Sequence, residues 1–150
     1  MSGFILGKLS YAREAGVELA FESKHTLPEP KNVETTHELI TILGNLIDNA
    51  IDAVGKRSEK RVKVKLDFEL RKGKLYLEVA DSGKGIQEET LASIFTKGFS
   101  TKGQNRGYGL YLVKQSIDKL EGNLMVDSFH EKGTVFYVEI PYEIRGADDD

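Results

Sequence analysis

The sequence predicts a two-layer α/β sandwich, in which a mixed, mainly antiparallel sheet carries helices on one face. Two segments space their apolar residues as an amphipathic helix does, and each is followed by two alternating segments joined by a short polar turn. Helices and hairpins of this kind bury their apolar sides by packing as two layers. The 150 residues are enough for one domain with its own core.

The N-terminal part of the chain contains a short strand, a break and then the first helix. Residues 17–21 alternate like a strand, and Pro28-Glu29-Pro30 interrupts the chain after them. Thr35, followed three residues later by Glu38, predicts a capping box for a helix over residues 39–54. The apolar residues that recur at helical spacing in this segment are Leu39, Ile42, Leu43, Leu46, Ile47, Ala50 and Val54.

Two hairpins and a second helix account for most of the remaining pattern. The first hairpin pairs residues 62–70 with residues 75–80, and charged side chains alternate with apolar ones along its first strand, which indicates one buried face. Residues 110–120 repeat apolar side chains at helical spacing. The second hairpin pairs residues 124–128 with residues 134–140.

Residues 87–106 have a weak pattern that is rich in Gly, Ser, Thr and Lys. Unpatterned segments of this length are often functional lids, and we interpret this one as a mobile lid. Residues 146–150, three of which are aspartate, are expected to form a disordered tail. The remaining residues, 1–145, are therefore expected to form a single domain.

The composition argues against several classes of function. A formal charge of −3, with Lys interspersed among Glu and Asp, leaves no basic stripe for nucleic acid. The absence of cysteine rules out disulfides and thiolate metal sites, and it is consistent with a reducing compartment. No apolar run approaches the roughly 20 residues of a membrane span, and the first residues lack the basic start of a signal peptide. We therefore expect a soluble domain with no membrane contact of its own.

The first predicted helix carries polar residues that are as regularly spaced as its apolar ones. Asn45 and Asn49 are four residues apart and so lie on one face, which Asp52 shares. Asn is a poor residue for the middle of a helix because its amide competes for backbone hydrogen bonds, so a pair of them suggests a ligand. An amide oxygen suits Mg²⁺, and Asn49 is our candidate metal ligand. The alternative is a solvated face on which Asn recurs by chance.

A carboxylate follows the second strand of the first hairpin. Asp81 ends a strand with a buried face, where it needs a hydrogen-bond partner, and the 6-amino group of adenine would supply one. Guanine presents a carbonyl oxygen there, so a fixed acceptor would discriminate against GTP. Gly83 and Gly85 would let the backbone approach the base. The alternative, which this motif in isolation favours, is a turn that simply follows a strand.

A second glycine pair stands directly before the second helix. The backbone N–H groups of Gly107-Tyr108-Gly109 and the positive end of the helix dipole could receive phosphate oxygens. A dinucleotide fingerprint is excluded because Leu112 stands where its third glycine belongs, and a P-loop is excluded because Gln104 replaces its lysine. The lid residues that could close over the phosphates are Lys97, Thr101, Lys102 and Arg106; the alternative is a solvated basic loop.

Together these segments resemble the five ordered motifs of the GHKL ATP-binding fold, which sensor histidine kinases share with gyrase-type topoisomerases, mismatch-repair ATPases and a heat-shock chaperone. The resemblance covers nearly the whole chain. The matching segments are residues 37–50 (N box), 81–86 (G1 box), 94–102 (F box), 107–110 (G2 box) and 133–136 (the final glycine-threonine element).

The resemblance implies a role for individual residues. Asn49 would bind Mg²⁺, Asn45 would lie beside the phosphates, and Asp81 would bind adenine with Thr134 nearby. As members of the same motifs, further residues would line the ATP site: Ile86, Phe95 and Leu110.

Asn45 distinguishes between two activities found in proteins with this fold, ATP hydrolysis and phosphoryl transfer. The gyrase and mismatch-repair relatives have a glutamate here that activates water, whereas an amide cannot take a proton, so hydrolysis lacks its usual base. Histidine kinases instead transfer the γ-phosphoryl group to an imidazole on a separate dimerisation domain, by alignment and charge neutralisation. None of His25, His37 and His130 stands in a pattern typical of a phosphoacceptor helix. We therefore expect an excised catalytic domain, inactive alone, whose partners are a dimerisation domain and, through the full kinase, a response regulator.

The sequences of residues 7–14 and 41–50 are similar to those of bacterial citrate and C4-dicarboxylate sensor kinases. This resemblance implies a cytoplasmic domain of a membrane-bound sensor. Two other functions stay open at this point: a serine kinase of the anti-sigma type, and a module in which ATP only orders residues 87–106 for interaction with a partner.

Overall fold

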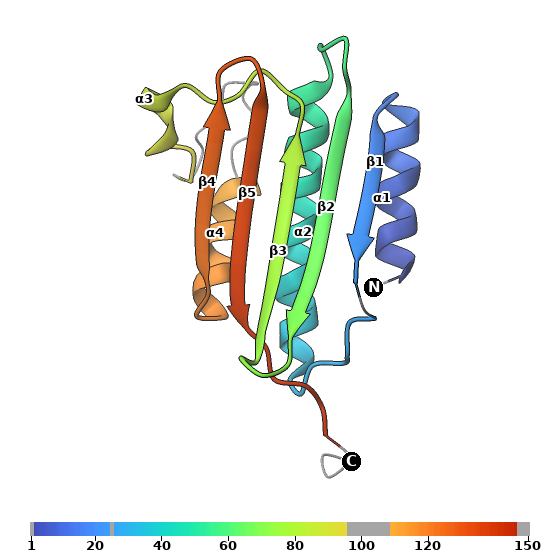
Figure 1. Cartoon of the computed structure of the whole chain (residues 1–150), viewed down its shortest axis with the longest axis vertical. Coiled ribbons are helices and arrows are strands. Elements are labelled where there is room, and N and C mark those ends of the chain that lie inside the picture. The colour runs from blue at the N-terminus through green and yellow to red at the C-terminus, as the bar shows by residue number, and fades with distance from the viewer. Residues whose placement is uncertain (1, 25, 96–108, 147–150) are drawn as a thin grey trace.

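The computed structural model describes residues 2–24, 26–95 and 109–146 (Figure 1). Its elements follow in chain order. They are α1 (Ser2–Glu14), β1 (Glu18–Ser23), α2 (Val33–Val54), β2 (Arg61–Glu69), β3 (Lys74–Asp81), α3 (Glu88–Leu91), α4 (Gly109–Lys119), β4 (Asn123–Phe129) and β5 (Gly133–Pro141).

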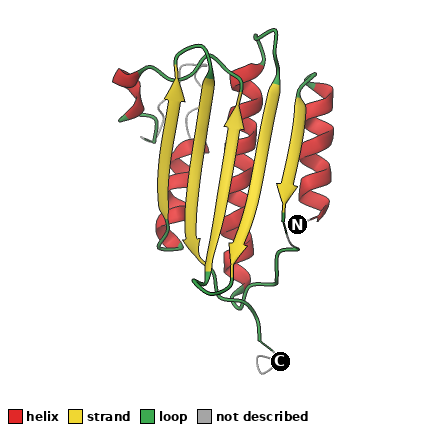
Figure 2. Cartoon of the chain, viewed as in Figure 1, coloured by secondary structure: helices red, strands yellow, loops and turns green. Residues whose placement is uncertain are grey.

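The strands form one sheet in the order β1-β2-β3-β5-β4. β1 runs parallel to β2, and every other neighbouring pair is antiparallel. Figure 2 shows α1, α2 and α4 side by side against one face of this sheet, with the other face left open. The predicted two-layer fold with a mixed sheet is confirmed.

Strand alternation separates the two faces of the sheet. Cross-strand register aligns Val64, Val79, Phe136 and Val126 in one row on the side that faces the helices. The first three of these residues are buried, whereas Lys63 and its neighbours of the same parity point to the open face. In the ranges that the structure describes, no helix is both long and apolar enough to cross a membrane.

Helix α2 is held by its apolar stripe rather than by helix propensity. Its interior includes threonine, asparagine and glycine, which are poor helix formers. Each fully buried Leu or Ile contributes roughly 1.5–3 kcal/mol. The buried residues of the helix are Leu39, Ile42, Leu43, Leu46, Ile47, Ala50, Ile51 and Val54.

The start of α2 differs from the prediction. The helix begins at Val33, and the Asn32 side chain accepts a hydrogen bond from the Glu34 N–H at 3.0 Å. The predicted Thr35 capping box is therefore wrong, because Asn32 already caps the helix one turn earlier. Glu38 instead lies 3.7 Å from Lys119 of α4.

Helix α1 was not predicted from the sequence. Leu6, Leu9 and Tyr11 are exposed, so its apolar residues do not mark one buried stripe. The helix contacts the rest of the fold at two points: Ala12 is buried in the core, and the Lys8 ammonium lies 2.7 Å from the Asp48 carboxylate of α2.

Candidate nucleotide-binding site

The polar side of α2 faces away from the sheet. Some of its residues contact α1 on one side, and others contact α4 on the other side. On one side Asp48 pairs with Lys8 of α1 at 2.7 Å. On the other side Glu38 approaches Lys119 of α4 at 3.7 Å. Asn45, Asn49 and Asp52 lie along the same arc and are partly exposed. The arc therefore supplies amide and carboxylate oxygens between two helices, as the predicted site requires.

Asn45 lies directly beside the first residue of α4. Its Nδ2 donates a hydrogen bond to the Thr41 carbonyl at 2.8 Å. A Cβ atom at Gly109 would stand 3.1 Å from Asn45 Oδ1, tighter than ordinary contact. The glycine that ends the second pair thus lets the start of α4 approach the N-box helix. Leu110, the next residue, packs against the core.

The first glycine segment meets the same helix near its C-terminal end. The Gly83 N–H donates to Asp81 Oδ1 at 2.8 Å, and a Cβ at Gly83 would lie 3.0 Å from the carbonyl oxygen of Ala53. Residues 45 and 53 of α2 are about 12 Å apart along the helix axis. The two glycine segments therefore lie about two turns apart on one helix, in the order needed for the base end and the phosphate end of one ligand.

A polar row crosses the end of the sheet where β3 and β4 end and β5 begins. Asp81 of β3 is registered with Thr134 of β5, which is registered with Ser128 of β4. The Ser128 and Thr134 hydroxyl oxygens are 3.0 Å apart, and Thr134 is only 4% exposed. By strand parity this row continues the helix-facing side of the sheet. The structure thus brings together Asp81 and Thr134, the pair expected beside adenine.

The turn between β4 and β5 holds the G1 segment in place. The Glu131 N–H donates to the Lys84 carbonyl at 2.7 Å. Gly85 has a φ of +85°, and a Cβ there would lie 2.5 Å from the Phe129 carbonyl oxygen. This close approach of two backbones requires glycine.

A charged contact ties this turn to the segment after α2. Arg57 donates to the Glu131 carboxylate at 2.6 Å and to the Glu131 carbonyl at 2.9 Å. The hydrogen bond from the guanidinium lowers the pKa of the Glu131 carboxyl. Glu131 itself adopts a φ of +62°. Arg57, Glu131 and the turn they hold were not predicted from the sequence.

Ser128 was also missed, although the sequence carries a signal for it. The Ile86 N–H donates to Ser128 Oγ at 2.5 Å, so this hydroxyl joins the G1 segment to the polar row. Residues 124–128 alternate, which places Ser128 on the same side as Leu124 and Val126. A hydroxyl at a core-facing position needs a hydrogen-bond partner, and that need was the available signal.

Part of the predicted lid lies within the described structure. Ile94 is buried, and the Phe95 ring packs edge-on against Phe136 with centroids 6.3 Å apart. The F-box segment is thus attached to the core at its start. The other predicted lid and G2 residues lie outside the described ranges, and their roles stay predictions: Lys97, Thr101, Lys102, Arg106, Gly107 and Tyr108.

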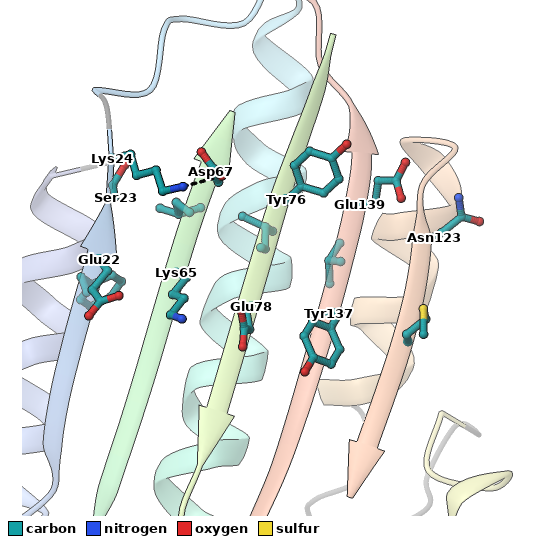
Figure 3. Close-up of a pocket in the computed structure, with 15 residues that line it drawn as sticks. Glu22, Ser23, Lys24, Lys65, Asp67, Tyr76, Glu78, Asn123, Tyr137 and Glu139 are labelled. Carbon is teal, nitrogen blue, oxygen red and sulfur yellow. Dashed lines mark ion pairs between the residues drawn. The ribbon is translucent and has the colours of Figure 1, made fainter. Parts of the chain in front are cut away.

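The open face of the sheet carries a hollow of about 640 Å³ (Figure 3). Its polar lining includes an ion pair between Lys24 and Asp67 at 4.0 Å, and Glu139 is paired with Lys74. Tyr76 and Tyr137 stand among these charges. The hollow lies across the sheet from Asn45, Asn49 and Asp81, so the residues predicted for a nucleotide converge on the other side.

Gly133 allows β5 to begin beside Asp81, and we predict a large loss of stability for Gly133→Ala. A Cβ there would lie 2.0 Å from the Asp81 carbonyl oxygen, and φ is +112°. Gly16→Ala is a matched control, because Gly16 has a φ of +73° with nothing within 4 Å. Urea unfolding should show a loss of about 1 kcal/mol for the control and about 3–4 kcal/mol for Gly133→Ala. Equal losses would contradict the described contact.

The chain is similar to known proteins over most of its length. A family model described as histidine kinase-, DNA gyrase B- and HSP90-like ATPase matches residues 34–144. The chain is 40% identical over 143 residues to the sensor histidine kinase DcuS of Escherichia coli K12, and 41% identical over 145 residues to the sensor protein CitS of Bacillus subtilis. Each alignment covers 95% of this chain and 26% of the relative. The chain thus spans about a quarter of the length of these relatives.

Solved structures agree with the fold and with the family. The catalytic domain of the histidine kinase ThkA, in a nucleotide-free form, superimposes with a TM-score of 0.73 at 25% identity, over 95% of this chain and 93% of that one. Full-length ShkA in complex with AMPPNP gives a TM-score of 0.78 at 25% identity, over 97% of this chain and 30% of ShkA. The resemblance predicted from the five motifs is confirmed, and the chain belongs to the family of histidine kinase-, DNA gyrase B- and HSP90-like ATPases.

Proposed function

We propose that this domain binds Mg-ATP and donates the γ-phosphoryl group to a histidine on a separate dimerisation domain of a two-component sensor kinase. The observation that carries the proposal is the position of the Asn45 amide. The amide lies beside the start of α4, where the phosphates would bind, and it donates to the Thr41 carbonyl. An amide cannot take a proton from water, so this position favours holding ATP for transfer over hydrolysis.

The neighbouring carboxylate on α2 does not replace the missing base in this proposal. Asp48 is paired with Lys8 at 2.7 Å and so is directed to the α1 side of the helix. Phosphoryl transfer to an imidazole needs no protein base to activate water, and it depends on alignment and charge neutralisation. Asn45 would therefore act on the phosphates by hydrogen bonding, with the predicted lid cations Lys97 and Lys102.

Asp81 and Thr134 would bind the adenine end of ATP. Asp81 Oδ1 already accepts the Gly83 N–H, which restrains the orientation of the carboxylate. The adenine amino group donates hydrogen bonds and therefore suits a carboxylate, whereas the guanine carbonyl oxygen does not. Gly83, Gly85 and Ile86 would form the backbone wall of this end of the site.

Mg²⁺ would be held by Asn49 together with the phosphates. The described arc of α2 offers hard oxygen donors of the kind that Mg²⁺ prefers, and Asn49 and Asp52 lie on it. A bound Mg²⁺ would neutralise charge on the β- and γ-phosphates. Asn49 supplies one ligand in this proposal, and Asp52 lies one turn farther along the helix.

The acceptor histidine would come from another domain of the same kinase. His37 is exposed in the first turns of α2, and His130 is exposed in the β4–β5 turn. We propose that residues 1–145 form one catalytic domain on the cytoplasmic side of a membrane-bound sensor, and that a response regulator receives the phosphoryl group from the dimerisation domain. The similarity to DcuS and to a probable C4-dicarboxylate sensor kinase of Halalkalibacterium halodurans supports this proposal.

Phosphoryl transfer is the direct test of this function. The domain is mixed with γ-labelled ATP, Mg²⁺ and the dimerisation fragment of its own kinase, and a fragment whose acceptor histidine is replaced by glutamine serves as control. We expect acid-labile phosphate on the intact fragment alone. Acid-stable phosphoserine on a protein partner would instead indicate the anti-sigma type of serine kinase. Normal ATP affinity without any transfer would indicate a nucleotide-gated interaction module.

Asp81→Asn should weaken ATP binding at least about tenfold in calorimetry. The amide oxygen can still accept the Gly83 N–H, so the turn is kept, while the NH₂ group replaces an acceptor that faces the adenine amino group. Asp118→Asn is the matched control, because Asp118 is exposed and paired with Lys114 on the surface of α4. An unchanged affinity for Asp81→Asn would rule out the adenine assignment.

Asn49→Ala should abolish most of the effect of Mg²⁺ on nucleotide affinity, because it removes the proposed protein ligand. Calorimetric titrations of ATP with and without Mg²⁺ measure this difference directly. Asn123→Ala, on the exposed start of β4, serves as the control for loss of an asparagine. If Mg²⁺ strengthens binding to Asn49→Ala as much as to the wild type, Asn49 is not the ligand.

A further inference from the structure

We propose that Ser128 is a positioning residue that directs the Thr134 hydroxyl at the adenine ring, so that an acceptor atom of the ring is recognised together with the amino group. The proposal rests on the proposed function, since it assumes that adenine binds at Asp81. The observation behind it is the continuous chain of hydrogen bonds from the G1 segment through Ser128 to Thr134.

The three polar residues occupy one row of the sheet. Asp81 is opposite Thr134, and Thr134 is opposite Ser128, on three neighbouring strands. Residues paired in this way have Cβ atoms about 4.5–5.5 Å apart. The next row on the same side is entirely apolar: Val64, Val79, Phe136 and Val126. The polar row therefore caps an apolar core, where each hydroxyl needs a defined partner.

The Ile86 N–H favours one direction for the hydrogen bonds along this row. Its backbone N–H can only donate, so Ser128 Oγ accepts that hydrogen bond at 2.5 Å. Accepting it polarises the Ser128 hydroxyl and favours donation of its own proton to Thr134 Oγ1, 3.0 Å away. In the proposed direction Thr134 accepts from Ser128, and its own proton is turned away from Ser128. Thr134 thus presents a hydrogen-bond donor beside the Asp81 acceptor.

Several hydrogen bonds hold the end of β4 beside the G1 segment. It stands at the end of β4, and the turn that follows is attached to the G1 segment by the Glu131–Lys84 backbone hydrogen bond. Arg57 donates two hydrogen bonds to Glu131 in the same turn. The segment that supplies the Ile86 N–H and the strand that supplies Ser128 are therefore joined at several points.

The Asp81 acceptor and the adjacent Thr134 donor together match one edge of adenine. The exocyclic amino group is a donor, and the adjacent ring nitrogen N1 is an acceptor, while guanine has the two reversed. Asp81 would meet the amino group, and the Thr134 proton would meet N1 either directly or through one water. Ser128 would thereby add to the discrimination between adenine and guanine without touching the base.

The test compares ATP with 1-deaza-ATP, which lacks the N1 acceptor, on the wild type and on Ser128→Ala. Calorimetry should show that the wild type binds ATP about three- to tenfold more tightly than 1-deaza-ATP. Ser128→Ala should lose most of this preference and bind the two nucleotides within about twofold of each other. Ser128→Thr keeps the hydroxyl and should restore the preference.

The outcomes separate this proposal from a purely structural role. Equal weakening of ATP and 1-deaza-ATP by Ser128→Ala would overturn it, because the preference for N1 would be intact. Failure of Ser128→Thr to restore the preference would overturn it as well. Wild-type protein that binds ATP without any preference over 1-deaza-ATP overturns this inference alone, whereas wild-type protein that does not bind ATP overturns the proposed function too. If Ser128→Ala unfolds, Ser128→Cys, with its weaker hydrogen bond, takes its place under the same expectation.

Discussion

The burial of one side of α2 against the sheet determines the rest of the site. The apolar stripe that includes Leu46 and Ile47 fixes the rotation of the helix, and the opposite arc, with Asn45 and Asn49, must then face outward. The same packing sets the position of the helix along the sheet, so that its C-terminal turn meets Gly83. A rotation or a slide of α2 would separate the amides from the G1 segment. The position of the proposed nucleotide site is therefore a consequence of core packing.

Sheet register supplies the second part of the site. β3 ends at Asp81 as β5 begins, and the absence of a side chain at Gly133 lets the two strands meet there without a clash. The apolar rows of the sheet stop at this end, and a polar row replaces them. The open face, with its paired charges around the hollow, has no comparable convergence of amides, carboxylate and closely approaching backbone among the described residues. Concavity alone would have pointed to the open face instead of the proposed site.

Much of this arrangement could be predicted from the sequence, because strand alternation and helical spacing are local patterns. Both hairpins, the stripe of α2 and the place of Asp81 at a strand end follow from such patterns. Helix α1 could not be found in this way, because its apolar residues mark no single buried stripe and its contacts, such as the Lys8–Asp48 pair, are with elements distant in sequence. The capping of α2 by Asn32 was missed because a second capping pattern followed it at Thr35. Ser128 and Arg57 act through partners more than 40 residues away, which only the folded chain brings together.

The central claim is that one ligand lies along the outer side of α2, with adenine at the end of β3 and phosphates at the start of α4. The most direct measurement is a crystal structure of the domain with Mg²⁺ and a non-hydrolysable ATP analogue. We expect the adenine amino group to lie within hydrogen-bond distance of the Asp81 carboxylate, and Mg²⁺ to bind the Asn49 amide oxygen. An analogue bound in the hollow on the open face, between Lys65 and Tyr137, would contradict the account.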